Sequence, residues 1–173
     1  YLGRLGRDVF TLKLKGFDRL VWLYRKYPKV PKMTIAMTTN TRLIEWFSSA
    51  IPEHAMHTNL LKIIIYEKLK NMRGSILIIP SRYEGFCLSM IEGMSQGLVP
   101  IVFPVGVAPE IIENGVNGFL VNSENEMKEA VDKLLSNDEL RLNMAREAAK
   151  TARKFRADSM AKSLISLYNS LLH

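Results

Sequence analysis

Residues 75–97 read SILIIPSRYEGFCLSMIEGMSQG, and this stretch decides the fold. It opens with an uninterrupted apolar run, residues 76–79, which lacks the polar-apolar alternation of a half-exposed strand and therefore predicts a strand covered by helices on both faces. Pro80 ends that run, and a helical pattern follows over residues 88–96. Gly97 comes directly after the pattern, at the position where a helix end favours a left-handed residue. The stretch is thus a strand, a turn and a helix, which is the repeating unit of a parallel α/β sheet.

Short apolar runs and helical patterns alternate in the same way along the rest of the chain. The predicted strands are residues 2–5, 33–37, 61–65, 76–79, 101–103 and 118–121. The predicted helices are residues 17–26, 42–49, 66–72, 88–96, 108–113, 124–135, 140–152 and 159–172. This order predicts a doubly wound, Rossmann-like three-layer α/β domain with a parallel sheet of about six strands. With 173 residues, 47% of them hydrophobic and 24% charged, the chain suits a single domain over 1–173.

Composition excludes several classes of protein. No apolar run reaches the roughly eighteen residues that a membrane-spanning helix needs. Cys87 is the only cysteine, which excludes an internal disulfide or a cysteine zinc site and favours a reducing, cytoplasmic setting. The chain contains no Asp-x-Asp pair, and its three histidines lack metal-ligand spacing, so we expect no bound metal. Because the sequence opens at Tyr1 without an initiator methionine, we expect it to be part of a longer protein.

The charge of the chain is strongly positive. Lys and Arg number 24 against 17 Asp and Glu, a net +7 that would attract phosphate esters, nucleic acid or an anionic membrane surface. A solvated basic face is the simpler interpretation. A nucleic-acid module would need aromatic residues interleaved with Lys and Arg to stack on bases, and Tyr24-Arg25-Lys26-Tyr27 is the only candidate. That segment is more simply the end of an amphipathic helix.

The turn over residues 80–88 offers the clearest binding chemistry, because ligands of open parallel sheets bind beyond the carboxyl ends of the strands. Gly85 permits a tight bend in this turn. The helix that follows presents the unpaired backbone amides of Phe86, Cys87 and Leu88, which suit an anion such as phosphate.

Glu84 and Glu92 are the acidic residues of this segment. They are eight positions apart, so on an ideal helix both carboxylates would lie on roughly the same side. Two such carboxylates can accept hydrogen bonds from the vicinal hydroxyls of a sugar or a ribose. Taken alone, the pair has a simpler structural explanation, in which Glu84 interacts with the helix dipole and Glu92 pairs with a surface base.

The residues around Glu84 and Glu92 favour sugar or ribose binding over a purely structural role for the two acids. Pro80-Ser81-x-x-Glu84-Gly85-Phe86-x-Leu88-x-x-x-Glu92-Gly93-Met94 resembles the signature of retaining GT-B glycosyltransferases of the family 4 group, also called glycosyl transferases group 1. The next blocks of that family are resembled, in order, by Gly97-x-x-Pro100-Ile101-Val102, Gly106-Val107-Ala108-Pro109-Glu110-Ile111-Ile112, Asn114-Gly115 and Asn117-Gly118-Phe119-Leu120-Val121. The resemblance is close over residues 75–121 and weaker over residues 1–26 and the C-terminal helices.

The resemblance implies that the chain is the donor-binding, C-terminal half of a GT-B fold, preceded in the full protein by an acceptor domain. By this carry-over, Arg4, Lys15 and the amides near Cys87 hold the donor diphosphate, Glu84 contacts the sugar and Glu92 the ribose. Two fixed bases make physical sense, since a departing nucleoside diphosphate gains negative charge. Glu84 is not assigned as a covalent nucleophile.

The sequence departs from the family pattern at four places, one of which is Gly106-Val107 in place of a more usual double glycine. The interval between Arg4 and Lys15 is longer than the usual loop and also contains Arg7 and Lys13, so which base reaches the phosphate stays open. Cys87 stands where the family commonly has glycine, and we interpret it as a small buried residue rather than a nucleophile. Residues 38–40, Thr-Thr-Asn, replace a glycine-rich turn.

The function implied is metal-independent, configuration-retaining transfer from a UDP-, GDP- or ADP-sugar to a saccharide, a lipid-linked or another acceptor. Such an enzyme would serve cell-surface polysaccharide or glycolipid synthesis in the cytoplasm, with peripheral contact at the inner face of the membrane compatible with its charge. The isolated domain should bind the donor and transfer little. The alternatives are a GT-B-like sugar-nucleotide epimerase, which would release epimerised donor without an acceptor, and a non-enzymatic basic module for nucleotides or nucleic acid. His54 and His57 flank a predicted loop and are interpreted as surface residues.

Overall fold

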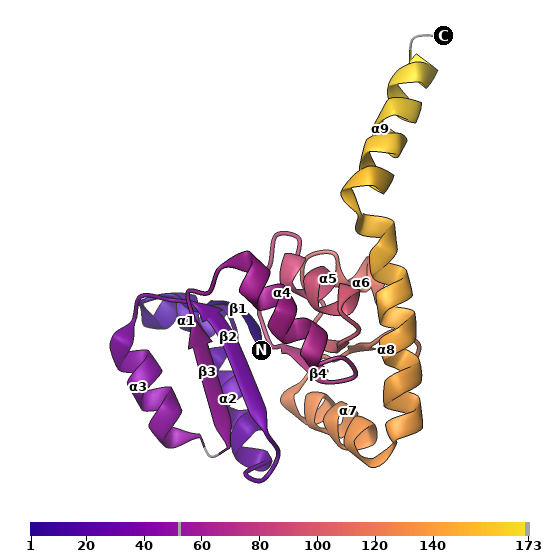
Figure 1. The fold of residues 1–173 in the computed structure, drawn as a ribbon. Coiled ribbons are helices and arrows are strands. Elements are labelled where there is room, and N and C mark those ends of the chain that lie inside the picture. The colour runs from indigo at the N-terminus through magenta and orange to yellow at the C-terminus, as the bar shows by residue number, and fades with distance from the viewer. Residues whose placement is uncertain (52, 172–173) are drawn as a thin grey trace.

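Strands alternate with helices up to β6 and only helical elements follow it in the computed structural model, which describes residues 1–51 and 53–171 (Figure 1). The first elements are β1 (Leu2–Arg4), α1 (Val9–Leu14), α2 (Phe17–Lys26), β2 (Lys32–Met37), α3 (Thr41–Ala50), β3 (His54–Thr58), α4 (Lys62–Asn71) and β4 (Ile76–Ile79). They are followed by α5 (Leu88–Ser95), β5 (Val99–Val102), α6 (Ala108–Ile111), β6 (Phe119–Leu120), α7 (Glu124–Ser136), α8 (Asp138–Ala152), the 3-10 turn η1 (Arg153–Phe155) and α9 (Ala157–Leu171).

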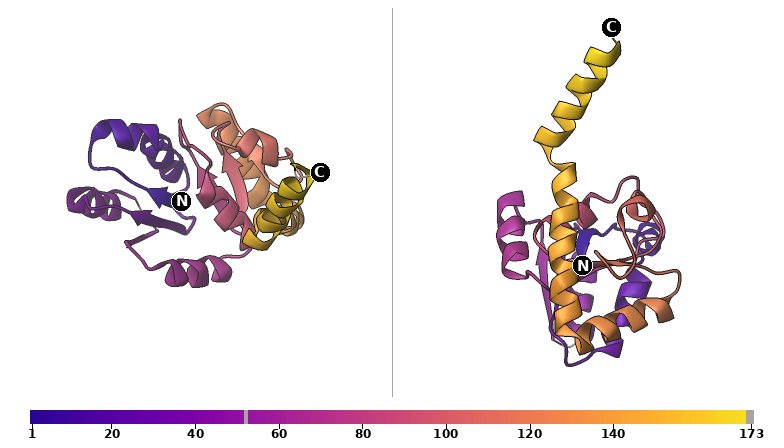
Figure 2. Two further views of the ribbon diagram at one scale, coloured as in Figure 1. Left: turned by 90° about the horizontal axis from the view of Figure 1, so that it is seen from above. Right: turned by 90° about the vertical axis from the view of Figure 1, so that its right-hand side faces the viewer.

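The strands are all parallel and form two sheets of three, in the orders β1-β2-β3 and β4-β5-β6. In the first sheet Leu2 is paired with Ile35, and in the second Ile78 is paired with Ile101. The two sheets lie side by side with β1 and β4 innermost (Figure 2). The predicted doubly wound α/β class with six parallel strands is confirmed, and side-chain packing rather than a ladder of hydrogen bonds joins its two halves. A largely apolar cavity of about 310 Å³ lies between them, with Leu2 on one side and Leu77 on the other.

The second sheet is the better buried of the two. All of β5 is buried, as expected for a strand with helices on both faces. Gly93 of α5 sits so close to β4 that an added Cβ would come within 2.4 Å of the Leu77 side chain. Gly97 follows α5 with a φ of +77°, in the left-handed conformation that the sequence predicted. Glycine at these two positions lets α5 pack against its strand and then turn sharply into β5.

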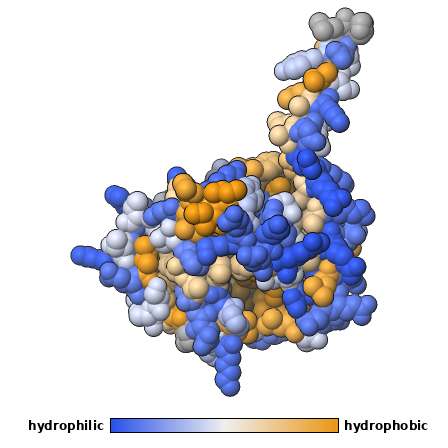
Figure 3. Space-filling view, in the orientation of Figure 1, coloured by the Kyte–Doolittle hydropathy of each residue, from blue (hydrophilic) through white to orange (hydrophobic). Residues whose placement is uncertain are grey.

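The third strand was predicted at the wrong place. Residues 61–65 form the start of α4 rather than a strand, and β3 covers His54–Thr58. Leu61 and Ile63 are 69% and 65% exposed, and a hydrophobic patch covers the start of α4 in Figure 3. The apolar run therefore marked a surface and not a core strand, whereas the real edge strand has a mixed composition that carries little strand signal.

Two smaller expectations also need correction. His54 is not a surface residue in a loop, because it lies in β3 and its ring packs edge-on against Phe47 at 4.3 Å between centroids. Residues 6–14 are not simply an extended loop, because they include α1, whose first turn is capped by Asp8 accepting a hydrogen bond from the Thr11 amide at 2.8 Å. In addition, Tyr24 is buried, so the Tyr24-Arg25-Lys26-Tyr27 segment is no stacking platform for bases.

The last helix stands apart from the rest of the molecule. The helix α9 projects away from the body in Figure 1 and in the right-hand view of Figure 2, and none of its described residues is buried. The predicted helix over residues 159–172 is therefore present, with its last residue outside the part of the chain that the structure describes.

Candidate functional site

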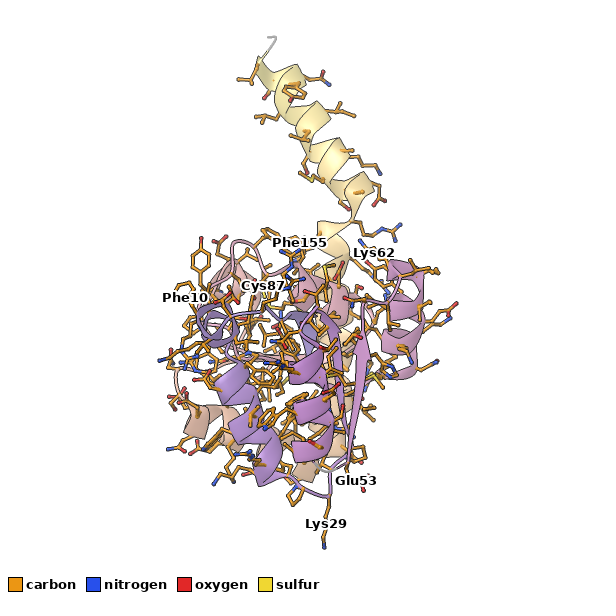
Figure 4. The ribbon with its side chains drawn as sticks, turned by 90° about the vertical axis from the view of Figure 1, so that its left-hand side faces the viewer. Phe10, Lys29, Glu53, Lys62, Cys87 and Phe155 are labelled. Carbon is orange, nitrogen blue, oxygen red and sulfur yellow. The ribbon has the colours of Figure 1, made fainter. Side chains whose placement is uncertain are left out.

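The segment between β4 and α5 lies at the end of the molecule where the strands finish. Figure 4 shows Cys87 at this end together with Phe10, Phe155 and Lys62, while Lys29 and Glu53 lie at the opposite end. We call residues 80–88 the donor turn and residues 13–18, which join α1 to α2, the α1–α2 corner. These two segments are more than sixty positions apart in sequence, and their contacts build the site.

Gly16 is the residue that lets the two segments meet. Its φ is +66°, and a Cβ added there would lie 1.9 Å from the Pro80 carbonyl oxygen. A side chain would therefore suffer both an unfavourable backbone conformation and a clash with backbone atoms. Next to this contact, the Arg82 amide donates a hydrogen bond to the Leu14 carbonyl at 2.8 Å. The corner is thus fixed directly against the carboxyl end of β4.

Arg82 reinforces the same junction with its side chain. Its guanidinium donates to the Lys13 carbonyl at 2.7 Å and, through both terminal nitrogens, to the Asp18 carboxylate at 2.7 Å. Partial burial opposes ionisation of Asp18, but the hydrogen bonds and charge of Arg82 outweigh it and hold the pKa of that carboxyl below its usual range. No local pattern of residues indicated this role, because a bidentate clamp depends on two segments distant along the chain.

The junction brings Lys15 to Glu84. The Lys15 ammonium donates to one oxygen of Glu84 at 2.8 Å, and the Ser81 hydroxyl donates to the other at 2.7 Å. The two charged side chains are 26% and 17% exposed, so the pair is shielded on most sides yet open to a ligand. Ser81 is buried, and only its place in the quoted signature pointed to it in the sequence.

Backbone amides follow immediately after Glu84. Among the described residues, the amides from Gly85 to Ser89 have neither a backbone nor a side-chain acceptor. The N-terminus of α5 therefore presents a row of donors with the positive end of the helix dipole behind them. This arrangement suits a phosphate group.

The bend of the donor turn occurs at Cys87 rather than at Gly85. Cys87 has a φ of +76°, whereas Gly85 has no left-handed conformation and open space around its Cβ position. The left-handed conformation that favours glycine thus occurs here with a cysteine side chain. Cys87 is buried as predicted, and burial, followed by the charge of Glu84, raises the pKa of its thiol to about 11. The thiol is therefore poorly suited to act as a nucleophile.

Glu92 lies apart from Glu84. Its carboxylate forms an ion pair with the Lys62 ammonium and accepts a hydrogen bond from the Tyr66 hydroxyl, both on α4 and both at 3.5 Å. Because α5 begins at Leu88, Glu84 precedes the helix by four residues, and the helical spacing that suggested a shared side does not relate the two carboxylates. Glu84 lies against the α1–α2 corner, whereas Glu92 lies against α4.

The remaining predicted bases are placed differently from Lys15. Arg4 ends β1 with an exposed side chain, and its guanidinium contacts the Met37 sulfur at 3.7 Å. Arg7 donates to the Thr39 hydroxyl at 2.6 Å, which ties the loop before α1 to the loop after β2. Within residues 1–51 and 53–171, no hydrogen bond or ion pair joins Arg4 or Lys13 to Glu84. Of the four bases between residues 4 and 15, the structure brings Lys15 alone to the acid.

A buried phenol that the sequence did not suggest lies beneath this site. The Tyr1 hydroxyl donates to the Arg4 carbonyl at 3.2 Å and packs under Gly3, where an added Cβ would come within 2.7 Å of it. Burial, and then the charge of Glu84, raise the pKa of this phenol, so it stays neutral. Gly3 thus leaves room for an aromatic ring beneath the site.

Comparison with known proteins identifies the family. The family model described as glycosyl transferases group 1 matches residues 57–151, more than half of the chain. The chain belongs to this family. An uncharacterized glycosyltransferase of Methanocaldococcus jannaschii is 33% identical over 99 residues, which cover 56% of this chain and 28% of that protein. The N,N'-diacetylbacillosaminyl-diphospho-undecaprenol alpha-1,3-N-acetylgalactosaminyltransferase of Campylobacter jejuni is 30% identical over 110 residues, covering 62% and 29%.

Solved structures show the same fold. Sucrose-phosphate synthase from Thermosynechococcus elongatus superposes with a TM-score of 0.80 at 19% identity, over 99% of this chain and 45% of that one. The C-terminal domain of a glycosyl transferase group 1 family protein from Francisella tularensis superposes with a TM-score of 0.66 at 23% identity, over 90% and 86%. The chain spans less than a third of the curated relatives named above, whereas it covers 86% of the C-terminal domain from Francisella tularensis.

In this group 1 chain, the later sequence blocks form the support behind the donor turn. Gly106 packs so closely that an added Cβ would lie 2.9 Å from the Phe86 backbone, and the Val107 amide donates to the Phe86 carbonyl at 3.3 Å. Asn117 is buried and caps the end of α6, accepting from the Glu113 amide at 2.9 Å and donating to the Ile111 carbonyl at 2.9 Å. These contacts fix the far side of the turn.

Over residues 1–51 and 53–171, no group of three or more His, Cys, Asp or Glu side chains is placed to hold a metal ion. Within the same residues, no helix combines the length and apolar character that crossing a bilayer requires.

Proposed function

We propose that this domain binds a nucleoside-diphosphate sugar at the donor turn and serves a glycosyltransferase. The Lys15–Glu84 pair beside the free amides from Gly85 to Ser89 carries the proposal, because it combines a cation, a carboxylate and a row of amide donors at the carboxyl edge of the sheet. An ammonium has three donor hydrogens, so Lys15 can keep its bond to Glu84 while donating to a phosphate oxygen.

The division of roles follows from the chemistry of each group. Lys15, Arg4 and the amides would stabilise the charge that develops on the departing nucleoside diphosphate, so no metal is required for that task. Glu84, with both oxygens already accepting hydrogen bonds, would orient hydroxyls of the donor sugar and favour positive charge at its anomeric carbon. Glu92, farther along α5, would contact the ribose. We propose that configuration is retained in the transfer.

The acceptor would be held by another domain of the full protein. The Campylobacter relative is named for transfer to a sugar-diphospho-undecaprenol, which makes a saccharide or lipid-linked acceptor the natural proposal here. Cell-surface polysaccharide or glycolipid synthesis in the cytoplasm is the corresponding setting. The donor domain by itself would bind nucleotide sugar and transfer little.

Calorimetric titration with UDP, GDP, ADP and their common sugars tests the proposal. We expect one of the three diphosphates to bind without added metal. Lys15→Ala should weaken its binding about tenfold or more, the value of a lost charge-assisted hydrogen bond to phosphate. Lys13→Ala is the matched control, since this exposed lysine two positions away has no hydrogen bond to the donor turn from its side chain. Glu92→Ala should weaken the nucleotide as well.

The result that would overturn the site assignment is equal binding of all three nucleotides by the unmodified chain and by the Lys15 and Glu92 variants. A larger loss for Lys13→Ala than for Lys15→Ala would instead transfer the phosphate contact to the other lysine. Proton NMR of the donor after incubation without acceptor separates transfer from epimerisation, because an epimerase would convert the free donor to an epimer with different ring-proton couplings.

A further inference from the structure

A second basic site lies away from the donor turn, in a groove between α4 and α8. The groove has a volume of about 430 Å³, and its floor is the C-terminal end of α5 with Gln96 and Gly97. Four basic residues line it: Lys70, Arg73, Arg153 and Arg156. In Figure 1, α4 and α8 flank α5 on the right-hand half of the molecule. The floor is separated from the amides of the donor turn by the length of α5, about 12 Å.

The basic side chains of this groove are largely uncompensated. No acidic residue lines it. Arg156 pairs with Asp158 at 3.1 Å, an exposed ion pair. Within the described part of the chain, the side chains of Lys70, Arg73 and Arg153 form no ion pair and donate no hydrogen bond. Three like charges therefore share one concave surface without an acid among them.

Helix dipoles explain part of this charge but not all of it. The last turns of α4, α5 and α8 all border the groove, and each helix C-terminus carries a partial charge of about −0.5. Three such termini offset about one and a half of the three free positive charges. The positive charge that remains favours an anion such as a phosphate monoester, which carries about −1.5 to −2 near neutral pH.

The floor of the groove also supplies a neutral hydrogen-bond donor between the basic side chains. The stem of Arg73 lies across Gly97, where an added Cβ would come within 3.0 Å of the arginine Cγ. The Ser95 hydroxyl donates to the Glu92 carbonyl at 2.7 Å and accepts from the Gln96 side-chain amide at 3.1 Å. Gln96 therefore has a second amide hydrogen free for an anion. Gly97 keeps the floor open, because any side chain there would meet Arg73.

We infer that this groove is a binding site for a phosphate monoester, separate from the donor turn. Arg73 and Arg153, from opposite walls, would each donate to the phosphate oxygens, with Lys70 adding charge and Gln96 a neutral donor. The phosphate could belong to a soluble sugar phosphate or to the headgroup of phosphatidic acid, which present the same chemistry to the groove.

Site-resolved titration distinguishes this groove from the donor turn. Inorganic phosphate is added to the 15N-labelled chain, and the amide shifts of Gln96 and Gly97 are followed beside those of Phe86 to Ser89. We expect a saturable shift at Gln96 and Gly97 that weakens with added salt. Arg73→Gln with Arg153→Gln should weaken that response about tenfold or more, and Lys15→Ala should leave it unchanged.

Matched variants separate charge from folding. Arg42→Gln removes one charge from an exposed position on α3 and should not change the response of Gly97. Arg153→Lys keeps the charge and should retain part of the binding that Arg153→Gln loses. Unchanged far-ultraviolet circular dichroism and urea midpoints show that each variant is folded.

Vesicles distinguish the two sources of phosphate. The chain is sedimented with phosphatidylcholine vesicles that contain phosphatidic acid and with vesicles that lack it. Binding only to the former, lost in the double arginine variant, assigns the groove to a lipid headgroup, whereas a response to inorganic phosphate without sedimentation assigns it to a soluble ester. The inference is overturned if Gln96 and Gly97 respond to neither probe, or if the double variant responds like the unmodified chain.

Discussion

Three glycines allow the construction of the site to be tested by stability measurements. Gly16→Ala combines a left-handed backbone with a Cβ 1.9 Å from the Pro80 oxygen, which is held in place by a hydrogen bond from Arg19 at 3.3 Å. Gly115→Ala has a φ of +80° but open space, and Gly85→Ala has neither problem. Alanine in the left-handed region costs about 1–2 kcal/mol. Alanine also lowers the entropy of the unfolded chain, a gain of about 0.4–1 kcal/mol.

These values predict an order of stability. Gly85→Ala should be neutral or stabilising by about 0.5 kcal/mol, and Gly115→Ala should lower the free energy of unfolding by about 0.5–1 kcal/mol. Gly16→Ala adds a backbone overlap of about 1–3 kcal/mol and should lose about 2–4 kcal/mol in total. Urea denaturation followed by circular dichroism measures all three. If Gly16→Ala loses no more than Gly115→Ala, the α1–α2 corner does not touch Pro80 as described, and the placement of Lys15 beside Glu84 fails with it.

Three further predictions concern single side chains. Ser81→Ala removes one donor to Glu84, so it should lower the free energy of unfolding by about 1 kcal/mol and, in calorimetry, weaken a nucleotide sugar more than its free diphosphate; equal loss for both would place Glu84 away from the sugar. Burial lowers the pKa of His54 from 6.5 to about 4, so as the pH falls the unfolded chain binds a proton at this residue before the folded chain does. The stability that neutral, buried His54 contributes is therefore fully present above pH 6.5 and is lost as the pH falls to about 4. The free energy of unfolding in urea, measured between pH 6.5 and 4, should depend less on pH in His54→Phe than in the unmodified chain. The same pH dependence in both would refute the burial of a neutral His54. The thiol of Cys87, with a pKa of about 11, should react with a disulfide reagent at about pH 8 far more slowly in the native chain than in urea, and equal rates would contradict its burial.

Of the six described strands, the sequence predicted five within two residues of their ends and misplaced only β3. β4 and β5 are continuous apolar runs between clear turn residues, and their boundaries differ from prediction by two residues or fewer. β3, by contrast, is an edge strand with half-buried His, Met and Thr, while the apolar run next to it begins a helix with exposed side chains. A run of apolar residues predicts burial only when something covers it. The sequence of residues 61–65 does not by itself show that one face of this segment is exposed to solvent.

The donor turn shows where local prediction of a site ends. Glu84, the following amides and Lys15 were identified from residue type and resemblance, but the Lys15–Glu84 bond depends on Gly16 meeting Pro80 and on Arg82 clamping the corner. None of these contacts joins neighbours in sequence. At Cys87 the sequence predicted a change that the backbone does not show. Cysteine in place of glycine suggested an altered pocket, yet the backbone has the left-handed conformation typical of glycine, with a φ of +76°. The surrounding contacts of Phe86 with Gly106 and Val107 hold that conformation, at a strain of about 1–2 kcal/mol. A turn kept in shape against that strain is what the proposed anion site requires, since its amide donors must converge before the phosphate arrives.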